Sequence, residues 1–115
     1  MIKLIKTKEN MSMKKIQEKV KEFCEKNNME HEIEYRVLDL VSEIGEVAKE
    51  ILKMTDYGKK SMEFREEIKL ELGDAFYSLI SIANYFNINL EEALNLVLEK
   101  YKKRLEKGSA GSEND

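Results

Sequence analysis

Apolar residues recur every three or four positions through most of this 115-residue chain, and no proline interrupts them. This spacing places apolar side chains on one face of an α-helix, whereas a half-buried strand needs alternation at every second position. Because proline breaks a helix interior, its absence allows long helices to continue. The sequence therefore predicts an all-α fold and argues against an all-β one.

Four segments carry the helical pattern and are separated by short polar breaks. They are predicted to span residues 12–27, 33–54, 62–86 and 89–107. Asn89, followed three residues later by Glu92, resembles a capping box at the start of the last helix. The second helix is expected to bury one apolar side, made of Val37, Leu38, Val41, Ile44, Ala48, Ile51 and Leu52.

The four helices predict a single bundle-like domain over residues 12–107. We expect residues 1–11 to form a short lead-in and residues 108–115 a flexible tail of small and polar residues. A chain of this length has little core to spare, so partner subunits would stabilise it.

Several classes of protein are disfavoured by composition. No apolar stretch approaches the roughly 20 residues that span a bilayer, and the N-terminus lacks the apolar core of a signal peptide. The single cysteine, Cys24, cannot form an internal disulfide, which fits a reducing cytoplasm. An isoelectric point near 5.4 disfavours nucleic-acid binding. We expect a cytoplasmic protein that binds neither membranes nor nucleic acid.

Two acidic pairs stand out on the second and third predicted helices. Glu43 and Glu46 are three residues apart with a glycine between them, and Glu71 and Asp74 repeat this arrangement. Side chains at this spacing project from nearly the same side of a helix. Asp39, Glu50 and Glu67 extend the two acidic stripes, although solvent exposure is the simpler interpretation for Glu50 and Glu67.

One interpretation is that both stripes are merely solvated faces. Like charges at helical spacing destabilise a helix, however, and Glu71 borders an apolar arc where it should be partly buried. If the two helices pack antiparallel through the 55–61 loop, the acidic pairs face each other and need cations between them. Oxygen ligands favour Mg²⁺, Mn²⁺ or Ca²⁺. A di-iron site would need histidines in these motifs, and the single His31 lies outside them.

The doubled motif Glu43-x-x-Glu46 and Glu71-x-x-Asp74 resembles the signature of the MazG-like, all-α nucleoside triphosphate pyrophosphohydrolases. The segments 40–47, 71–74 and 82–93 are also typical of that family, and the resemblance covers residues 35–107. It implies an oligomeric enzyme that hydrolyses a (d)NTP to the nucleoside monophosphate and pyrophosphate. A house-cleaning role in the nucleotide pool is the expected context.

The resemblance also implies roles for individual residues. Glu43, Glu46, Glu71 and Asp74 are expected to hold Mg²⁺, with Mn²⁺ as a substitute, and to form the catalytic group. Either Glu46 or Glu43 would also act as the base. Lys100 and Arg104 match basic positions that contact phosphates in the family, although both also compensate a helix dipole.

The substrate-binding side is less defined. Asn84 is a polar residue on an apolar helix and could contact base or ribose, although a polar position on the helix surface is the simpler explanation. The chain has no tryptophan to stack on a base, so Tyr77, Tyr85 and Phe64 are the candidates. The resemblance implies a homodimer or homotetramer. The alternative is a non-catalytic helical module whose acidic face binds a metal or a basic partner.

Overall fold

The computed structural model describes residues 11–108, and within them it contains helices and no strands. The helices are α2 (Met13–Lys26), α3 (Ile33–Met54), α4 (Glu67–Tyr85) and α5 (Leu90–Glu106). The all-α prediction is thus confirmed. Residues 1–10 of the expected lead-in and 109–115 of the expected tail lie outside the described residues. No helix of the described part is both long enough and apolar enough to cross a membrane.

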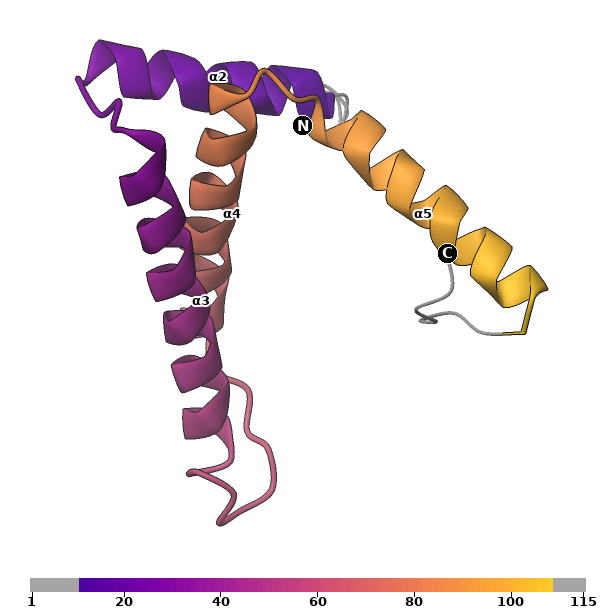
Figure 1. Ribbon diagram of the computed structural model, residues 1–115. Coiled ribbons are helices and arrows are strands. Elements are labelled where there is room, and N and C mark those ends of the chain that lie inside the picture. The colour runs from indigo at the N-terminus through magenta and orange to yellow at the C-terminus, as the bar shows by residue number, and fades with distance from the viewer. Residues whose placement is uncertain (1–10, 109–115) are drawn as a thin grey trace, which may run out of the picture.

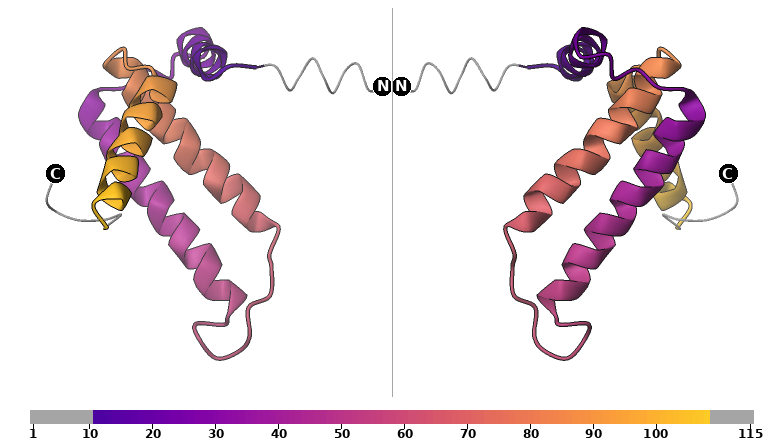
Figure 2. Two further views of the ribbon diagram at one scale, coloured as in Figure 1. Left: turned by 90° about the vertical axis from the view of Figure 1, so that its right-hand side faces the viewer. Right: turned by 90° about the vertical axis from the view of Figure 1, so that its left-hand side faces the viewer.

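Helices α3 and α4 run antiparallel, side by side, and form a long hairpin (Figures 1 and 2). Helix α2 lies across the end of the hairpin at which α3 begins and α4 ends (Figure 1). Helix α5 then leaves this end and diverges from the hairpin. The hairpin is therefore the element that brings the two acidic motifs together.

The third predicted helix begins later than expected, at Glu67 rather than at Met62. After α3 the chain reverses through Asp56, Tyr57 and Gly58, all of which have positive φ. The backbone N–H of Glu63 then donates to the carbonyl of Met54 at 2.8 Å, which ties the returning segment to the end of α3. Residues 61–65 consequently run back as extended chain, and helical spacing alone could not reveal this.

A hydrogen-bonded network holds α2 onto the hairpin. The Gln17 side chain is buried and donates to Asn84 Oδ1 at 3.0 Å and to the carbonyl of Ile88 at 2.8 Å. Its Oε1 accepts from the backbone N–H of Leu90, and Asn84 Nδ2 donates to the Gln17 carbonyl. Gln17 therefore links α2 to the end of α4 and to the first residue of α5.

The contact line between α3 and α4, which we call the helix seam, is partly polar. On α3 the seam follows the half-buried and buried residues Ile33, Arg36, Leu40, Glu43, Val47, Glu50 and Met54. On α4 it follows Ile68, Glu71, Ala75, Ser78 and Ile82. Both lists have the alternating three- and four-residue spacing of packed helices. Thus the side of α3 that faces α4 carries charged residues as well as apolar ones.

The apolar side predicted to be buried on α3 is exposed within a single chain. Val37, Val41 and Ile44 are 44%, 63% and 54% exposed. Leu38, Ala48, Ile51 and Leu52 are exposed as well. The expectation of burial is therefore wrong for the isolated chain, because α3 contacts α4 through the neighbouring seam, which contains both charged and apolar residues.

These exposed residues form one continuous surface with residues of α4. Most of them lie one position after a seam residue, as Val41 follows Leu40 and Phe76 follows Ala75, and one position is a rotation of about 100°. Because the helices are antiparallel, the same rotation brings both stripes to the same side of the hairpin. We call this surface the apolar face; it comprises Val37, Val41, Ile44, Ile51, Leu72, Phe76 and Leu79.

The described chain buries few apolar side chains of its own. Its buried apolar residues are Cys24, Met54, Ile80 and Ala83, and no residue of α5 is buried. The radius of gyration is 17.8 Å, whereas a compact domain of about 100 residues has about 13 Å. The hairpin and α5 thus leave much apolar surface without a partner inside the chain.

Candidate metal centre

Three carboxylates from the two motifs meet across the helix seam. One carboxylate oxygen from each of Glu43, Glu71 and Asp74 lies within 4.8 Å of the other two. Glu43 and Glu71 are half-buried on the seam, and Asp74 is exposed. Glu43 of the first acidic pair therefore faces both members of the second pair across the antiparallel helices.

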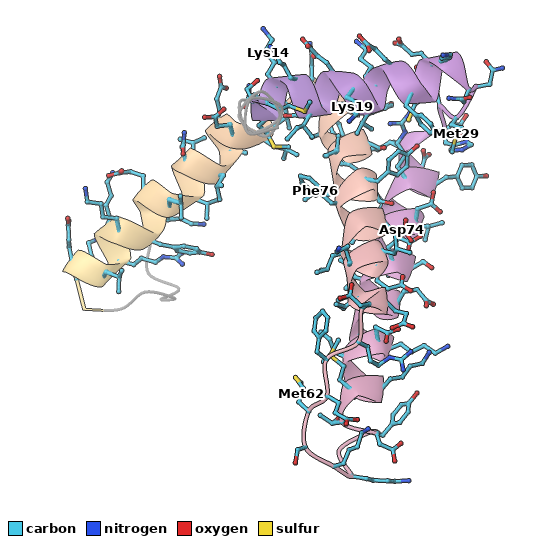
Figure 3. The ribbon with its side chains drawn as sticks, turned by 180° about the vertical axis from the view of Figure 1, so that it is seen from behind. Lys14, Lys19, Met29, Met62, Asp74 and Phe76 are labelled. Atoms are coloured by element: carbon cyan, nitrogen blue, oxygen red, sulfur yellow. The ribbon has the colours of Figure 1, made fainter. Side chains whose placement is uncertain are left out.

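The helical register decides which acids enter this cluster. Glu43 and Glu71 occupy the seam itself, whereas Glu46 and Asp74 each precede a seam residue and lie on the side opposite the apolar face. Figure 3 shows Asp74 and Phe76 projecting from different sides of α4. Asp74 reaches back to the cluster, but Glu46 is exposed and does not belong to the group within 4.8 Å.

The electrostatics show that the cluster is crowded with negative charge. The pKa of Glu43 is raised above its usual value, first by burial and then by the charges of Asp74, Glu71, Glu46 and Asp39. Burial and like charges both disfavour ionisation of a carboxyl group. Without a cation, the folded chain therefore keeps these acids together at an energetic cost.

A hard divalent cation fits this set of donors. Carboxylate oxygens from two helices converge on one point, and the raised pKa of Glu43 is the effect that a bound positive charge would reverse. Glu43, Glu71 and Asp74 are the residues that could hold such an ion. Glu46 is close enough to influence Glu43 and could complete the set or contact a water.

This arrangement predicts a pH dependence of stability in metal-free protein. Because the pKa of Glu43 is higher in the folded state, its contribution to stability is complete below the unfolded pKa, near 4.5, and is lost as the pH rises through the folded pKa. Replacing Glu43 by Gln removes this loss. The melting temperature of Glu43→Gln minus that of the parent chain, measured in EDTA, should therefore increase from pH 4 to pH 7.

The same experiment with Mg²⁺ provides the control. Metal ligands must be deprotonated, so Mg²⁺ should stabilise the parent chain more at pH 7 than at pH 4 and should stabilise Glu43→Gln less. A melting-temperature difference that stays constant with pH in EDTA would contradict the proposed repulsion.

An ion pair lies at the end of the seam next to the loop between α3 and α4. Glu50 has a side chain only 5% exposed and accepts a hydrogen bond from Arg65 Nε. Arg65 Nη2 also lies 3.8 Å from Glu67 Oε2. Glu50 is therefore buried and paired, which corrects the interpretation of Glu50 as a solvated residue. Helical spacing could have placed Glu50 on the seam, but Arg65 lies outside any helix and gave no signal.

At the opposite end of the cluster the seam opens into a small cleft near α2. Its lining includes Arg36, Asp39, Tyr77 and Ser78. Arg36 donates to the carbonyls of His31 and Ser81, and the Tyr77 hydroxyl contacts Cys24 Sγ at 3.0 Å. Burial and the neighbouring Cys24 raise the pKa of Tyr77 to about 12. This cleft begins one helical turn from Glu43 and Asp74.

The remaining predicted residues lie away from the carboxylate cluster. Asn84 comes ten residues after Asp74, about 15 Å along α4, and both ends of its amide bond to Gln17. Lys100 and Arg104 flank the Tyr101 ring, with Lys100 Nζ at 5.8 Å and Arg104 Cζ at 5.7 Å from the ring centre. They lie on the half of α5 that Figure 1 shows apart from the hairpin.

Comparison with known proteins identifies the family. The family model of the MazG nucleotide pyrophosphohydrolase domain matches residues 32–109, which include the whole α3–α4 hairpin and α5. The chain belongs to the MazG family. The resemblance suggested by the doubled acidic motif is thus confirmed, and α2 lies before the matched region.

The chain is also similar to a Bacillus protein whose structure is described as that of a pyrophosphatase. The chain is 35% identical to YpjD of Bacillus subtilis (strain 168) over 66 residues, which are 56% of this chain and 60% of the length of YpjD. The crystal structure of YpjD has a TM-score of 0.67 at 30% identity and covers 80% of this chain and 96% of that one.

A second solved structure is similar to the same extent. It is the Bacillus-conserved MazG protein, described as a nucleotide pyrophosphohydrolase, with a TM-score of 0.67 and 30% identity. The alignment covers 79% of this chain and 89% of that protein. The all-helical MazG-type fold is therefore shown by structure as well as by sequence.

Proposed function

We propose that this protein is a Mg²⁺-dependent nucleoside triphosphate pyrophosphohydrolase that converts a (d)NTP to the nucleoside monophosphate and pyrophosphate. The observation that carries the proposal is the convergence of Glu43, Glu71 and Asp74 across the hairpin of a MazG-family chain. A divalent ion held by these residues would supply charge neutralisation and Lewis acidity at the triphosphate. Mn²⁺ is expected to substitute for Mg²⁺.

An acidic residue of the chain can also act as the general base. Water attacks the α-phosphorus, and the bond from that phosphorus to the oxygen bridging to the β-phosphate breaks. Glu46 is the stronger candidate for the base, because it lies next to Glu43 but outside the group of three converging carboxylates. Glu43 remains the alternative. A carboxylate not used as a ligand can accept the proton of the attacking water.

Three residues are proposed to bind the substrate, with different support. Helix α5 diverges from the hairpin of its own chain (Figure 1). Lys100 and Arg104 would therefore contact phosphates at the hairpin of a second copy. Asn84 stays a prediction; in the single chain its side-chain amide is hydrogen-bonded to Gln17.

We further propose that the chain works as a homo-oligomer assembled through the apolar face. Its residues are 42% to 63% exposed, and no helix of the described chain covers them. A second copy presents the same surface, which makes a two-fold symmetric contact self-complementary. Because Asp74 and Glu46 lie on the opposite side of the hairpin, such a contact would leave the cluster accessible. A dimer of dimers would also be compatible with it.

The activity is tested with a panel of canonical and damaged nucleoside triphosphates. Mg²⁺-dependent release of pyrophosphate, with the monophosphate as the second product, is the expected result, and EDTA should abolish it. A preference for a damaged or non-canonical substrate would support the proposed house-cleaning role. Such a role acts on the nucleotide pool of the cytoplasm, where we expect the protein to be. Failure on every triphosphate, with no thermal stabilisation by Mg²⁺ and a non-hydrolysable analogue, would instead favour a non-catalytic binding module.

A further inference from the structure

The ion pair between Arg65 and Glu50 connects the start of α4 to the side of α3. Arg65 lies at the end of the extended segment, two residues before α4 begins, and Glu50 lies on the seam of α3. Glu66, which precedes α4, makes no side-chain capping hydrogen bond. Arg65 is thus the side chain at this end that joins the beginning of α4 to α3 by an ion pair.

The position of this pair relates it to the metal centre. Glu50 follows Glu43 by seven residues, about 10 Å along α3, and Glu67 precedes Glu71 by four, about 6 Å along α4. Arg65 contacts both Glu50 and Glu67. The same guanidinium therefore contacts both helices within two turns of the carboxylates that converge across the seam.

The burial of Glu50 makes the contact specific. A carboxylate that is only 5% exposed needs a partner, because an unpaired buried charge is strongly unfavourable. A guanidinium is planar and offers donors in a fixed geometry, so it fixes the direction as well as the charge of the contact. The other ion pair of this loop, Lys60 with Glu63 at 2.6 Å, is exposed and joins residues three apart.

We propose that Arg65 is a positioning residue for the metal centre: held by Glu50, it sets the spacing and rotation of α4 against α3, and hence the distance from Glu43 to Glu71 and Asp74. This inference rests on the proposed function, because the geometry of the metal centre matters only if the protein uses a bound ion. It concerns the geometry of the carboxylates, however, and can be tested without turnover. Arg65 itself is not expected to touch the ion.

The test compares two ions of equal charge. Mg²⁺ demands near-ideal octahedral geometry at short distances, whereas Ca²⁺ tolerates irregular sites with longer bonds. Removing Arg65 changes the electrostatic potential at the cluster for both ions alike, but a change in carboxylate spacing weakens Mg²⁺ more. The ratio of the Mg²⁺ to the Ca²⁺ dissociation constant, measured by calorimetry on the folded full chain, therefore isolates the positioning effect.

We expect Arg65→Met to raise this ratio about tenfold, because Mg²⁺ binding should weaken by the roughly 10- to 100-fold typical for residues that support metal ligands and Ca²⁺ binding by much less. The matched control, Lys60→Met, removes a lysine from the exposed pair in the same loop and should leave the ratio unchanged. If Arg65→Met does not fold, Arg65→Lys keeps the charge but loses the planar fork, and about a threefold increase is expected.

Two outcomes would overturn the proposal. One is a fall in melting temperature with an unchanged ion ratio, which would give Arg65 a purely structural role. The other is an equal shift for both ions, which would give it a purely electrostatic role. Failure of every nucleoside triphosphate as a substrate would refute the proposed activity, while a changed ion ratio would still support the positioning role.

Discussion

Replacing Glu71 by Gln, or Asp74 by Asn, is expected to reduce pyrophosphate release at least about a hundredfold while the fold remains intact. Both residues belong to the group of carboxylates that lie within 4.8 Å of one another. Each substitution removes a negative oxygen donor but keeps nearly the same shape. Since it also relieves repulsion, the melting temperature in EDTA should stay the same or increase. Steady-state pyrophosphate release and thermal unfolding measure the two effects.

The matched control for this prediction is Glu22→Gln, which makes the same chemical change on the exposed surface of α2. It should alter neither turnover nor Mg²⁺ binding. Variants of Glu71 or Asp74 that unfold, or that keep more than about a tenth of the parental activity, would contradict the assignment of these residues as metal ligands.

A glutamate in place of Val41 is expected to dissociate the proposed oligomer. Val41 lies within the apolar face and is 63% exposed in the single chain, so the fold itself should tolerate the change. In a two-fold contact the substitution would bury two like charges without partners. We expect the dissociation constant of the assembly to rise at least about a hundredfold, measured by sedimentation equilibrium.

Tyr35→Glu is the matched control for that experiment. Tyr35 lies on the same helix and is 60% exposed, but it precedes a seam residue and therefore faces the side opposite the apolar face. This variant should assemble like the parent chain. A parent chain that is monomeric at high concentration, or an equal effect of both variants, would refute assembly through the apolar face.

The same two variants also test whether catalytic activity depends on assembly. If Lys100 and Arg104 reach the substrate from a second copy, Val41→Glu should lose activity with assembly, whereas the carboxylates should still bind Mg²⁺. Retention of full activity by the monomer would place those two residues outside the site.

Much of the candidate metal centre could be predicted from the sequence because the arrangement of its carboxylates depends on local geometry. The spacing of Glu43 from Glu46 and of Glu71 from Asp74 fixes which carboxylates share a helix side. A short connection between two long helices makes them antiparallel neighbours, so the two motifs had to approach each other. The doubled motif also identified the family correctly.

Other features could not be predicted, because helical periodicity does not say which side of a helix meets its neighbour. The apolar side of α3 was the natural choice for burial, yet α3 packs on α4 through Glu43 and Glu50 and leaves Val41 exposed. A sequence pattern shows how much apolar surface a helix carries but does not show whether the same chain or another copy covers it.

The sequence by itself determined the helical class, the four segments and the acidic pairs, since these follow from residue spacing along one chain. Only the tertiary structure decided that Glu46 stays outside the group of three converging carboxylates, that Glu50 is buried against Arg65, and that α4 begins at Glu67. These features depend on how one helix is rotated against another and on the path of the loop between them. Both are set by contacts between residues that are distant in the sequence.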